Sequence, residues 1–485
     1  MTTFDAGDIT LHRVREHVWE IPKEGEMRVP ARVFASEALL EEIADDKTLQ
    51  QLRNATHLPG IRKYAICMPD GHQGYGFPVG GVAGIDAENG CISPGAIGYD
   101  INCGVRMVKT NLSYDDLRGH EEELVDALFE AIPSGLGGGG VIEGDHGALE
   151  SALERGVEWC LDSGYAIESD LEHCEDNGVR RDAEPDFVPQ RAKDRGQNQM
   201  GSLGSGNHFL EVQRVTDVFD EATADAYGLE TDQVVVLIHC GSRGLGHQLC
   251  TDYLREIETT HSDLVNQLPD KELAAAPAGS QLAEEYYGAM CAAINFAWVN
   301  RQLITHRTRT VFADVFGESP EDLGMELLYD VAHNIAKKEV HEVDGEDTEL
   351  FVHRKGATRA FPAGRPEVPE AYREVGQPVI IPGSMGAGSY VLRGGANSLD
   401  VSFGSTAHGA GRLMSRTQAK DEFWGDDVQT DLRNREVYVK AQSGATIAEE
   451  APGVYKDIDE VVRVSESLGI GDAVVRVEPV CNIKG

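Results

Sequence analysis

One stretch, Gly98–Arg106, constrains this chain more than any other part of it. Its sequence is G-Y-D-I-N-C-G-V-R, which puts the carboxylate of Asp100 three residues before the thiol of Cys103, with glycines on either side of the pair. Glycine permits positive φ and close backbone approach, so the two side chains can face one small volume. A hard oxygen beside a soft sulfur is a plausible start for a transition-metal site. A buried cysteine next to a turn aspartate has the same local sequence, so the rest of the chain must decide.

The net charge of the chain is extreme. Lys and Arg total 43 and Asp and Glu total 82 over 485 residues, which gives a net charge of −39. The acidic residues are spread along the chain, for example at Glu41–Asp46, Glu121–Asp126 and Asp426–Asp431. A scattered excess suits a solvated surface in concentrated salt better than a patch for one basic partner. In molar salt the Debye length is about 3 Å, so this charge would still allow an anionic substrate.

Composition also bears on where the protein works. The chain has no run of about 18 apolar residues, which argues against a transmembrane helix. Its first residues lack the basic segment and apolar core of a signal peptide. Nine cysteines without a C-x-x-C pair fit neither a disulfide framework nor a zinc ribbon. We therefore expect a cytoplasmic protein, in a salt-loving cell, that does not associate with membranes.

The hydrophobic pattern predicts an α+β fold. Gln233–His239 has the pattern of a fully buried strand that ends at a histidine. Leu282–Phe312 and Glu321–Val340 have helical periodicity, and Ala65–Gly84 is typical of a glycine-rich loop with short strands. The sequence contains no internal repeat and no clear linker. We expect one large compact domain over residues 1–485, with mixed sheets and surrounding helices around a central cleft.

Four histidines lie in distinctive local sequences. His208 follows G-S-L-G-S-G-N, His239 ends the predicted strand, His333 lies in V-A-H-N-I-A-K-K-E and His408 lies in G-S-T-A-H-G-A-G-R. A lone histidine is more often structural or solvated than a ligand. The four become informative only if the fold brings them toward Asp100.

Convergence would give a metal site with two ions. The set Asp100, Cys103, His208, His239 and His333 is too large for one closed tetrahedral ion. It suits two ions that share the thiolate and keep open positions, an arrangement used in phosphoryl chemistry. Mn²⁺, Zn²⁺ and Co²⁺ are all compatible with these ligands, and spacing does not choose among them.

Nucleotide binding would have to differ from the common forms. Glycine-rich turns at 201–206, 383–389 and 404–411 can offer backbone N–H groups to phosphates. However, the chain has neither a G-x-x-x-x-G-K-[ST] motif, which disfavours a P-loop NTPase, nor the K-x-D-G signature of ordinary nucleotidyl-transferring ligases. The polar segment Gly178–Gln199 holds the densest basic cluster, which suits either phosphate contacts or a solvated loop.

Taken together, the motifs resemble the RtcB family of RNA ligases, the tRNA-splicing ligases that use GTP and manganese. They run in order through nearly the whole chain: M-P-D-G-H-Q-G-Y-G-F-P-V-G-G, G-Y-D-I-N-C-G-V-R, L-G-S-G-N-H-F-L-E, H-C-G-S-R-G-L-G, H-N-I-A-K-K-E, H-R-K-G-A-T-R, P-G-S-M-G, S-T-A-H-G-A-G-R and the terminal N-I-K-G. The resemblance implies an RtcB-like fold around a metal and nucleotide cleft. With the acidic composition, it also implies an origin in a halophilic archaeon.

The resemblance implies two Mn²⁺ ions and GTP as cofactors. The five residues named above would be the metal ligands, with their division between the ions left open. His408 would attack the α-phosphorus of GTP and form a histidine–GMP intermediate. A neutral imidazole, available near the ordinary pKa of about 6.5, suits such covalent catalysis.

Other implied roles concern the nucleotide and the RNA. Glu211 and Lys484 would read the guanine edge, because a carboxylate accepts from the N1 and N2 hydrogens and an ammonium donates to O6. Further nucleotide contacts would come from Asn207, Phe209, Ser384, Ser389, Ala410, Gly411, Arg412 and Tyr455. RNA phosphates would be held by Arg191, Lys193 and Arg243, and Asp70 would take part in opening a cyclic phosphate. Without the resemblance, the position of Lys484 predicts only a frayed, solvated C-terminus.

The implied reaction joins RNA carrying a 2′,3′-cyclic phosphate or 3′-phosphate to RNA carrying a 5′-hydroxyl, as in tRNA splicing and RNA repair. We expect a monomer, and the resemblance implies the small protein archease as a partner. Two other classes stay open. A dinuclear phosphodiesterase or phosphatase without ligation would use the metals but has no need of His408. A non-catalytic RNA-binding protein with a structural metal leaves five ligands poorly explained.

Overall fold

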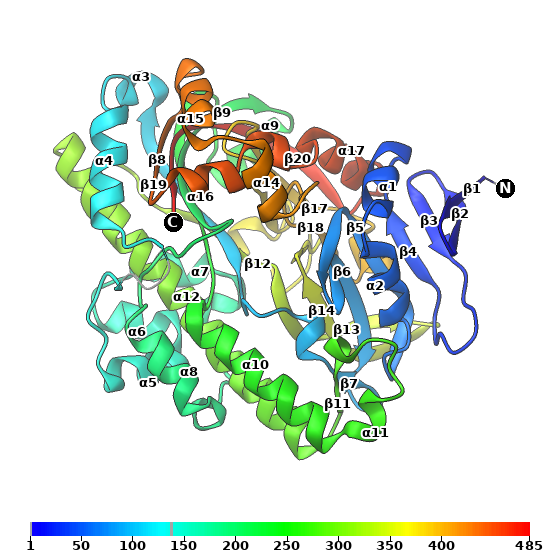
Figure 1. Ribbon diagram of the computed structural model, residues 1–485. Helices are drawn as coiled ribbons and strands as arrows, with labels where there is room; N and C mark the ends of the chain where they lie inside the picture. The colour runs from blue at the N-terminus through cyan, green and yellow to red at the C-terminus, as the bar shows by residue number, and fades with distance from the viewer. Residues whose placement is uncertain (1, 136–138) are drawn as a thin grey trace.

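The computed structural model describes residues 2–135 and 139–485, and two large β-sheets carry its core (Figure 1). Among these residues the first sheet has eight strands, in the spatial order β1 (Thr3–Ala6), β2 (Ile9–Arg15), β3 (Val18–Ile21), β4 (Ala31–Phe34), β5 (Ile61–Tyr75), β6 (Phe77–Asp86), β14 (Glu346–Lys355) and β13 (Asn334–Val343). The second sheet has the order β12 (Leu327–Ala332), β8 (Gly104–Ser113), β10 (Gln233–Cys240), β9 (Phe209–Val218), β20 (Gly471–Lys484), β17 (Ser389–Gly394) and β16 (Pro378–Ile381), with β19 (Tyr438–Ala441) beside β20. Two short pairs, β7 (Cys91–Ile92) with β11 (Ala276–Pro277) and β15 (Ala357–Arg359) with β18 (Ser405–Ala407), complete the β-structure of the described residues.

Both large sheets are mixed. Most neighbouring strands run antiparallel, whereas β4 pairs with β5 and β19 pairs with β20 in parallel. The predicted strand Gln233–His239 is β10, which is buried along nearly its whole length. The predicted α+β fold with mixed sheets is therefore confirmed.

The longest helix is α12, Gln281–Phe316, which crosses the molecule in Figure 1 and is buried over most of its length. It confirms the helix expected at Leu282–Phe312. The Ser280 side chain accepts a hydrogen bond from the backbone N–H of Ala283 at the start, and Gly317 ends the helix with a left-handed φ of 72°. Its 36 residues span about 54 Å, enough to pass beneath the second sheet from one side to the other.

Shorter helices surround the sheets, and α10 packs against α12 (Figure 1). They are α1 (Glu37–Ala44), α2 (Thr48–Ala55), α3 (Tyr114–Leu117), α4 (Glu121–Ala131), α5 (His146–Arg155), α6 (Val157–Asp162), α7 (Glu168–Glu172), α8 (Gln190–Gln197), α9 (Glu221–Tyr227), α10 (Arg243–Thr260), α11 (Ser262–Val265), α13 (Ser398–Ser402), α14 (Arg416–Glu422), α15 (Gly425–Asn434), α16 (Gly444–Glu449) and α17 (Ile458–Leu468). Within the described residues, none of the helices combines the length and apolar character needed to cross a bilayer.

The helix predicted over Glu321–Val340 is wrong. This segment forms β12 and β13, and His333 is the single residue between them. The helix-favouring Glu, Leu, Ala and Lys of the segment are overridden by tertiary pairing, because β12 joins β8 in the second sheet while β13 joins β14 in the first. His333 therefore lies where the chain passes from one large sheet to the other.

The strands expected within Ala65–Gly84 are confirmed, but the glycine-rich loop is wrong, since the segment lies within the long paired strands β5 and β6 apart from Gly76 between them. Its glycines serve close packing of backbone on backbone. A Cβ atom at Gly80 would lie 2.9 Å from the Cα atom of Gly71, so only glycine fits there.

A buried ion-pair cluster ties α12 to the second sheet. Asp330, on β12, accepts hydrogen bonds from Nε of Arg106 at 2.8 Å and from Nε and Nη2 of Arg301 at 2.8 Å each. None of the three side chains is exposed to solvent. Since this one carboxylate is the ion-pair partner of both buried guanidinium groups, its loss would leave two positive charges close together without it.

We predict that Asp330→Ala lowers the free energy of unfolding by about 3–5 kcal/mol, because removing one partner of a buried ion pair strands the other. Chemical unfolding followed by circular dichroism at fixed salt measures this. The matched control is Asp431→Ala at an exposed carboxylate, which should change stability by no more than about 0.5 kcal/mol. Equal losses in the two variants would contradict the prediction.

Candidate active site

The ends of several strands meet at one edge of the second sheet. The start of β8 at Gly104 pairs with Cys240, at the end of β10, and with Ala332, at the end of β12. On the next strand along, Phe209 pairs with both His239 and Lys484. Residues from five distant segments are thereby brought to one place, and His333, just before β13, and Lys355, at the end of β14, reach the same place.

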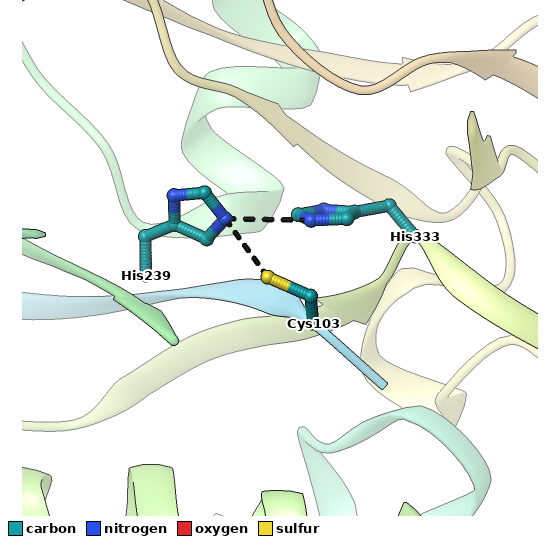
Figure 2. A group of neighbouring side chains, drawn as sticks. All are labelled: Cys103, His239 and His333. Carbon is teal, nitrogen blue, oxygen red and sulfur yellow. Dashed lines mark hydrogen bonds between the residues drawn. The ribbon is translucent and has the colours of Figure 1, made fainter. Parts of the chain in front are cut away.

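The five predicted metal ligands converge here as two groups that share Cys103. The first group is Cys103, His239 and His333, and the second is Asp100, Cys103 and His208, with the ligand atoms of each group within 4.8 Å of one another. Figure 2 shows Nε2 of His239 between the other two ligands of its group, 3.3 Å from Sγ of Cys103 and 3.3 Å from Nε2 of His333. In the second group, Nε2 of His208 lies 3.4 Å from Sγ of Cys103 and 2.9 Å from Oδ2 of Asp100.

Backbone carbonyl groups set which ring nitrogen faces the centre. Nδ1 of His208 donates to the carbonyl oxygen of Leu203 at 3.0 Å, and Nδ1 of His239 donates to that of Asn207 at 3.1 Å. The Nε2 atoms therefore present lone pairs toward the thiol and the carboxylate. Acceptor atoms so close together repel one another unless a cation lies between them, so these residues fit metal ions.

Burial favours the neutral, ligating form of the imidazoles. It lowers the pKa of His239 and of His333 well below the usual value, and neighbouring histidines add to the effect. Burial raises the pKa of Asp100, but His208 and Arg243 outweigh it and bring that pKa to about 2. Burial and then Asp100 raise the pKa of the Cys103 thiol, and a bound cation would compensate by stabilising the thiolate.

His408 lies against this group, with its ring centroid 4.8 Å from that of His333. Its Nδ1 donates to Oδ2 of Asp70 at 2.5 Å, and the same oxygen accepts from the backbone N–H groups of His408 and Gly409 at 2.9 and 3.2 Å. Asp70 is fully buried. The carboxylate thus fixes the ring and leaves Nε2 of His408 as the free nucleophilic nitrogen.

A cavity of about 300 Å³ joins His408 to the metal ligands and to several predicted nucleotide contacts. Its lining includes Asn207, Phe209, Ala410, Gly411, Arg412, Tyr455 and Lys484. Gly411 has a φ of 80°, and a Cβ atom there would lie 2.2 Å from the carbonyl oxygen of Asp70. This close approach holds the 409–412 turn against the residue that orients His408.

Lys484 is held in place rather than frayed. It ends β20, only 4% of it is exposed, and its ammonium lies 4.9 Å from the centre of the Phe209 ring. The expectation of a solvated C-terminus is therefore wrong, because pairing with β9 extends to the penultimate residue. A charged ammonium is consequently available at a buried wall of the cavity.

A buried carboxylate that sequence reasoning missed, Glu450, organises this wall. It lies 2.9 Å from Nη1 of Arg412 and 3.6 Å from Nζ of Lys484, and it accepts a hydrogen bond from the Tyr455 hydroxyl. Burial raises its pKa, but Lys484 and Arg412 lower it further, so the net shift is downward. No motif marks Glu450, since it follows α16 in an ordinary acidic pair.

Glu211 lies within the second sheet, where its carboxylate accepts hydrogen bonds from the side-chain amides of Gln213 and Asn482. Burial raises the pKa of Glu211 to about 7, although Lys484 opposes this. Oγ of Ser389 accepts a hydrogen bond at 3.2 Å from the side-chain amide of Gln213, the same amide that donates to Glu211. Ser384 and Ser389 are buried and, among the described residues, are not part of the cavity lining.

The three predicted RNA contacts differ in position. Arg243 begins α10 next to the site, with Nε 3.2 Å from Oγ of Ser202. Arg191 is exposed on α8, whereas the ammonium of Lys193 is buried and lies 2.7 Å from Oε1 of Glu150. Of the three, Arg243 is the one that the fold brings to the site.

Sequence reasoning also missed Lys355, which lines the cavity from the end of β14. Its ammonium donates to the carbonyl oxygens of Tyr75 and Gly95, and burial lowers its pKa to about 8. The motif H-R-K-G-A-T-R contains this lysine together with four other charged or polar residues, and nothing in the sequence distinguishes the lysine from them.

Comparison with known proteins gives one consistent family. A family model described as "tRNA-splicing ligase RtcB" matches residues 51–485. A tRNA-splicing ligase RtcB of Thermococcus kodakarensis is 54% identical over 98% of this chain and 99% of its own length. Proteins of the same name from Aeropyrum pernix and Archaeoglobus fulgidus are 51% and 48% identical, each over 98% of this chain and 100% and 99% of their own lengths.

Removing the shared thiol should affect both metal groups. We predict that the wild-type protein binds two equivalents of a thiophilic divalent ion such as Co²⁺, that Cys103→Ala loses both high-affinity equivalents, and that His333→Ala loses one. Equilibrium dialysis and the thiolate-to-Co²⁺ charge-transfer absorption measure this. Cys160→Ala, at a buried thiol in a helix, is the matched control. Two tightly bound ions in the folded Cys103→Ala protein would exclude a shared thiolate.

Proposed function

The chain belongs to the RtcB family of tRNA-splicing ligases and is an RNA ligase, and from this premise we propose that it uses GTP and two Mn²⁺ ions to join a 2′,3′-cyclic phosphate or 3′-phosphate RNA end to a 5′-hydroxyl end. The ligation would pass through a guanylylated histidine. We also propose that the whole chain acts as one ligase domain. A cytoplasmic location, a monomeric state and help from archease remain predictions.

One observation carries the proposal. Nδ1 of His408 donates a hydrogen bond to the buried carboxylate of Asp70, and its Nε2 is free beside the predicted metal ligands. This is the tautomer that a nitrogen nucleophile needs. The full burial of Asp70 favours an orienting role over direct contact with a cyclic phosphate. A histidine oriented by a carboxylate can also act as a general base in a hydrolase, so attachment of GMP to the protein is the property that distinguishes the two functions.

In the proposed sequence a cyclic phosphate is first hydrolysed to a 3′-phosphate. Nε2 of His408 then forms a bond to the α-phosphorus of GTP while the bond to pyrophosphate breaks. The RNA 3′-phosphate next takes GMP from His408, and finally the 5′-hydroxyl attacks the activated phosphate and releases GMP. When bound, the metal ions would neutralise phosphate charge and stabilise the leaving groups.

The wall around Glu450 supports a guanine site. Lys484 would donate a hydrogen bond to O6 of the base. Glu211, which lies three residues after the predicted ligand His208, would accept hydrogen bonds from the N1 and N2 hydrogens of the base. Adenine carries a donor where guanine has O6, so ATP would leave these buried groups poorly paired. Phe209 and Tyr455 would pack on the base, and Arg412, anchored by Glu450, would contact phosphate or ribose.

The main alternative is a dinuclear phosphodiesterase without ligation. It needs the same ligands but predicts no covalent attachment of GMP. GTP labelled at the α-phosphate distinguishes the two functions.

We predict that the wild-type protein acquires an acid-labile label from α-labelled GTP and that His408→Ala does not. Asp70→Asn should slow labelling by up to about 10⁴-fold, because an amide can hold the ring in the wrong tautomer. His120→Ala, at a half-buried histidine, is the control and should label normally. A label on His408→Ala would move the nucleophile elsewhere, and an unlabelled wild-type protein that still opens cyclic phosphates would favour the phosphodiesterase.

We further predict that the KM for GTP in the labelling reaction rises as the pH falls through about 7. Because the pKa of Glu211 is raised to about 7, its carboxyl is protonated below this pH and no longer accepts two hydrogen bonds. Glu211→Gln should weaken GTP binding about 10-fold or more and remove this pH dependence. Lys484→Ala should narrow the preference for GTP over ATP, and unchanged discrimination in that variant would exclude Lys484 from base recognition.

A further inference from the structure

Three aromatic rings form an exposed group that continues the lining of the catalytic cavity. Tyr75 and Tyr99 both line the cavity, and their rings meet edge to face at 6.0 Å and 89°. The ring of Tyr99 is stacked on that of His247 at 5.0 Å and 29°. The Tyr75 residue is 64% exposed and His247 is also exposed, so flat apolar faces remain open to solvent next to the reacting groups.

The backbone beneath Tyr75 is fixed although its ring is exposed. Tyr75 ends β5 at the tip of the hairpin with β6, and its carbonyl oxygen accepts a hydrogen bond from the buried ammonium of Lys355. The next residue, Gly76, has a φ of 67°, and a Cβ atom there would lie 2.8 Å from the carbonyl of Glu272. Because the backbone is fixed, only the side-chain torsions of Tyr75 have to be ordered when a ligand covers the ring.

Two arginines lie near His247, one on α10 and one on α8. Arg243 and His247 are four residues apart on α10, so they share a face of that helix. Arg195, exposed on α8, donates from Nη1 to the side chain of Gln248 at 3.1 Å. Planar rings next to guanidinium groups are the combination that binds an unpaired base together with its phosphate.

We propose that Tyr75, Tyr99 and His247 form a stacking platform for the unpaired nucleobase next to a reacting RNA end, with Arg243 on the adjoining phosphate. The inference rests on the proposed function, because it concerns the RNA substrate of the same site. It adds a subsite for a base, distinct from the guanine site at Lys484.

Stacking suits a chain with a net charge of −39. Phosphate contacts weaken steeply as salt rises, because the counterions that binding releases gain less entropy when the surrounding salt is already concentrated. The attraction between a base and an aromatic face does not depend on counterions. Glu258 and Glu272 lie near Tyr99 and would repel a phosphate on their side of the ring, so the RNA backbone is directed toward the arginines.

The test is a double-mutant cycle between a protein ring and an RNA base. Short RNAs, labelled at the far end, carry either a 3′-phosphate or a 5′-hydroxyl at the reacting end, with the nucleotide there intact or abasic. Fluorescence anisotropy gives the Kd of each RNA for wild-type, Tyr75→Ala and Tyr75→Phe proteins. Phe219→Ala, at an exposed ring elsewhere, is the matched control.

We expect Tyr75→Ala to weaken binding of one of the two intact RNAs by roughly 5- to 100-fold and of its abasic form by less than about 2-fold. Tyr75→Phe and Phe219→Ala should bind as the wild type does. The ratio of the Kd of Tyr75→Ala to that of the wild type, for the intact RNA, should persist as KCl is raised. The strand that responds identifies which RNA end is stacked. Equal effects on intact and abasic RNA for both strands would overturn the platform.

The same preparations separate the two proposals. If wild-type protein takes a label from GTP and ligates RNA but shows no coupling between Tyr75 and a base, the platform is wrong and the ligase mechanism stands. If coupling is found but no wild-type preparation is labelled by GTP, the guanylylation mechanism is wrong while the base subsite stands.

Discussion

The arrangement of the active site depends on one buried guanidinium, that of Arg301 on α12. Its Nη1 donates to the carbonyl oxygens of Asn102 at 2.8 Å and Cys240 at 2.7 Å, and two of its nitrogens bind Asp330. These three partners lie one residue before Cys103, one residue after His239 and three residues before His333. A single planar, permanently charged group therefore ties together the backbone next to three predicted metal ligands, which a flexible ammonium would do less rigidly.

Buried charge and surface charge play opposite parts in this protein. The surface carries the acidic excess, whereas the interior holds arginines and lysines, each matched to a carboxylate or to carbonyl groups, as at Arg106, Arg301 and Lys337. The basic cluster of Gly178–Gln199 follows the same rule, since Arg180 pairs with Asp176 and Arg181 with Glu158. A dense run of basic residues in an acidic chain is thus a poor indicator of phosphate binding, because most of these charges already form ion pairs within the protein.

The sequence alone was sufficient to predict features that have a local signal, and insufficient for features that depend on contacts between distant parts of the chain. The five side chains that converge were named from motifs that resemble one family, and the long helix could be predicted from its periodicity. Glu450 and Lys355 could not be singled out, because their importance comes from neighbours far away in the chain. The segment around His333 was predicted as a helix because its residue types favour one, and only pairing with two different sheets makes it extended. Lys484 shows the same limit, since chain-end position says nothing about strand pairing.

Two of the predicted ligand histidines differ from His408, the predicted nucleophile, in the group that accepts the hydrogen bond from Nδ1. His208 and His239 donate to neutral backbone carbonyls, which suits imidazoles that remain neutral while they bind a cation. His408 donates to the carboxylate of Asp70. In the proposed guanylylation, bond formation at Nε2 puts positive charge on this ring while Nδ1 keeps its proton, and a carboxylate stabilises that charge better than a carbonyl does. In the proposed mechanism the imidazole group would therefore serve two kinds of chemistry in one cavity, according to the charge of its hydrogen-bond acceptor.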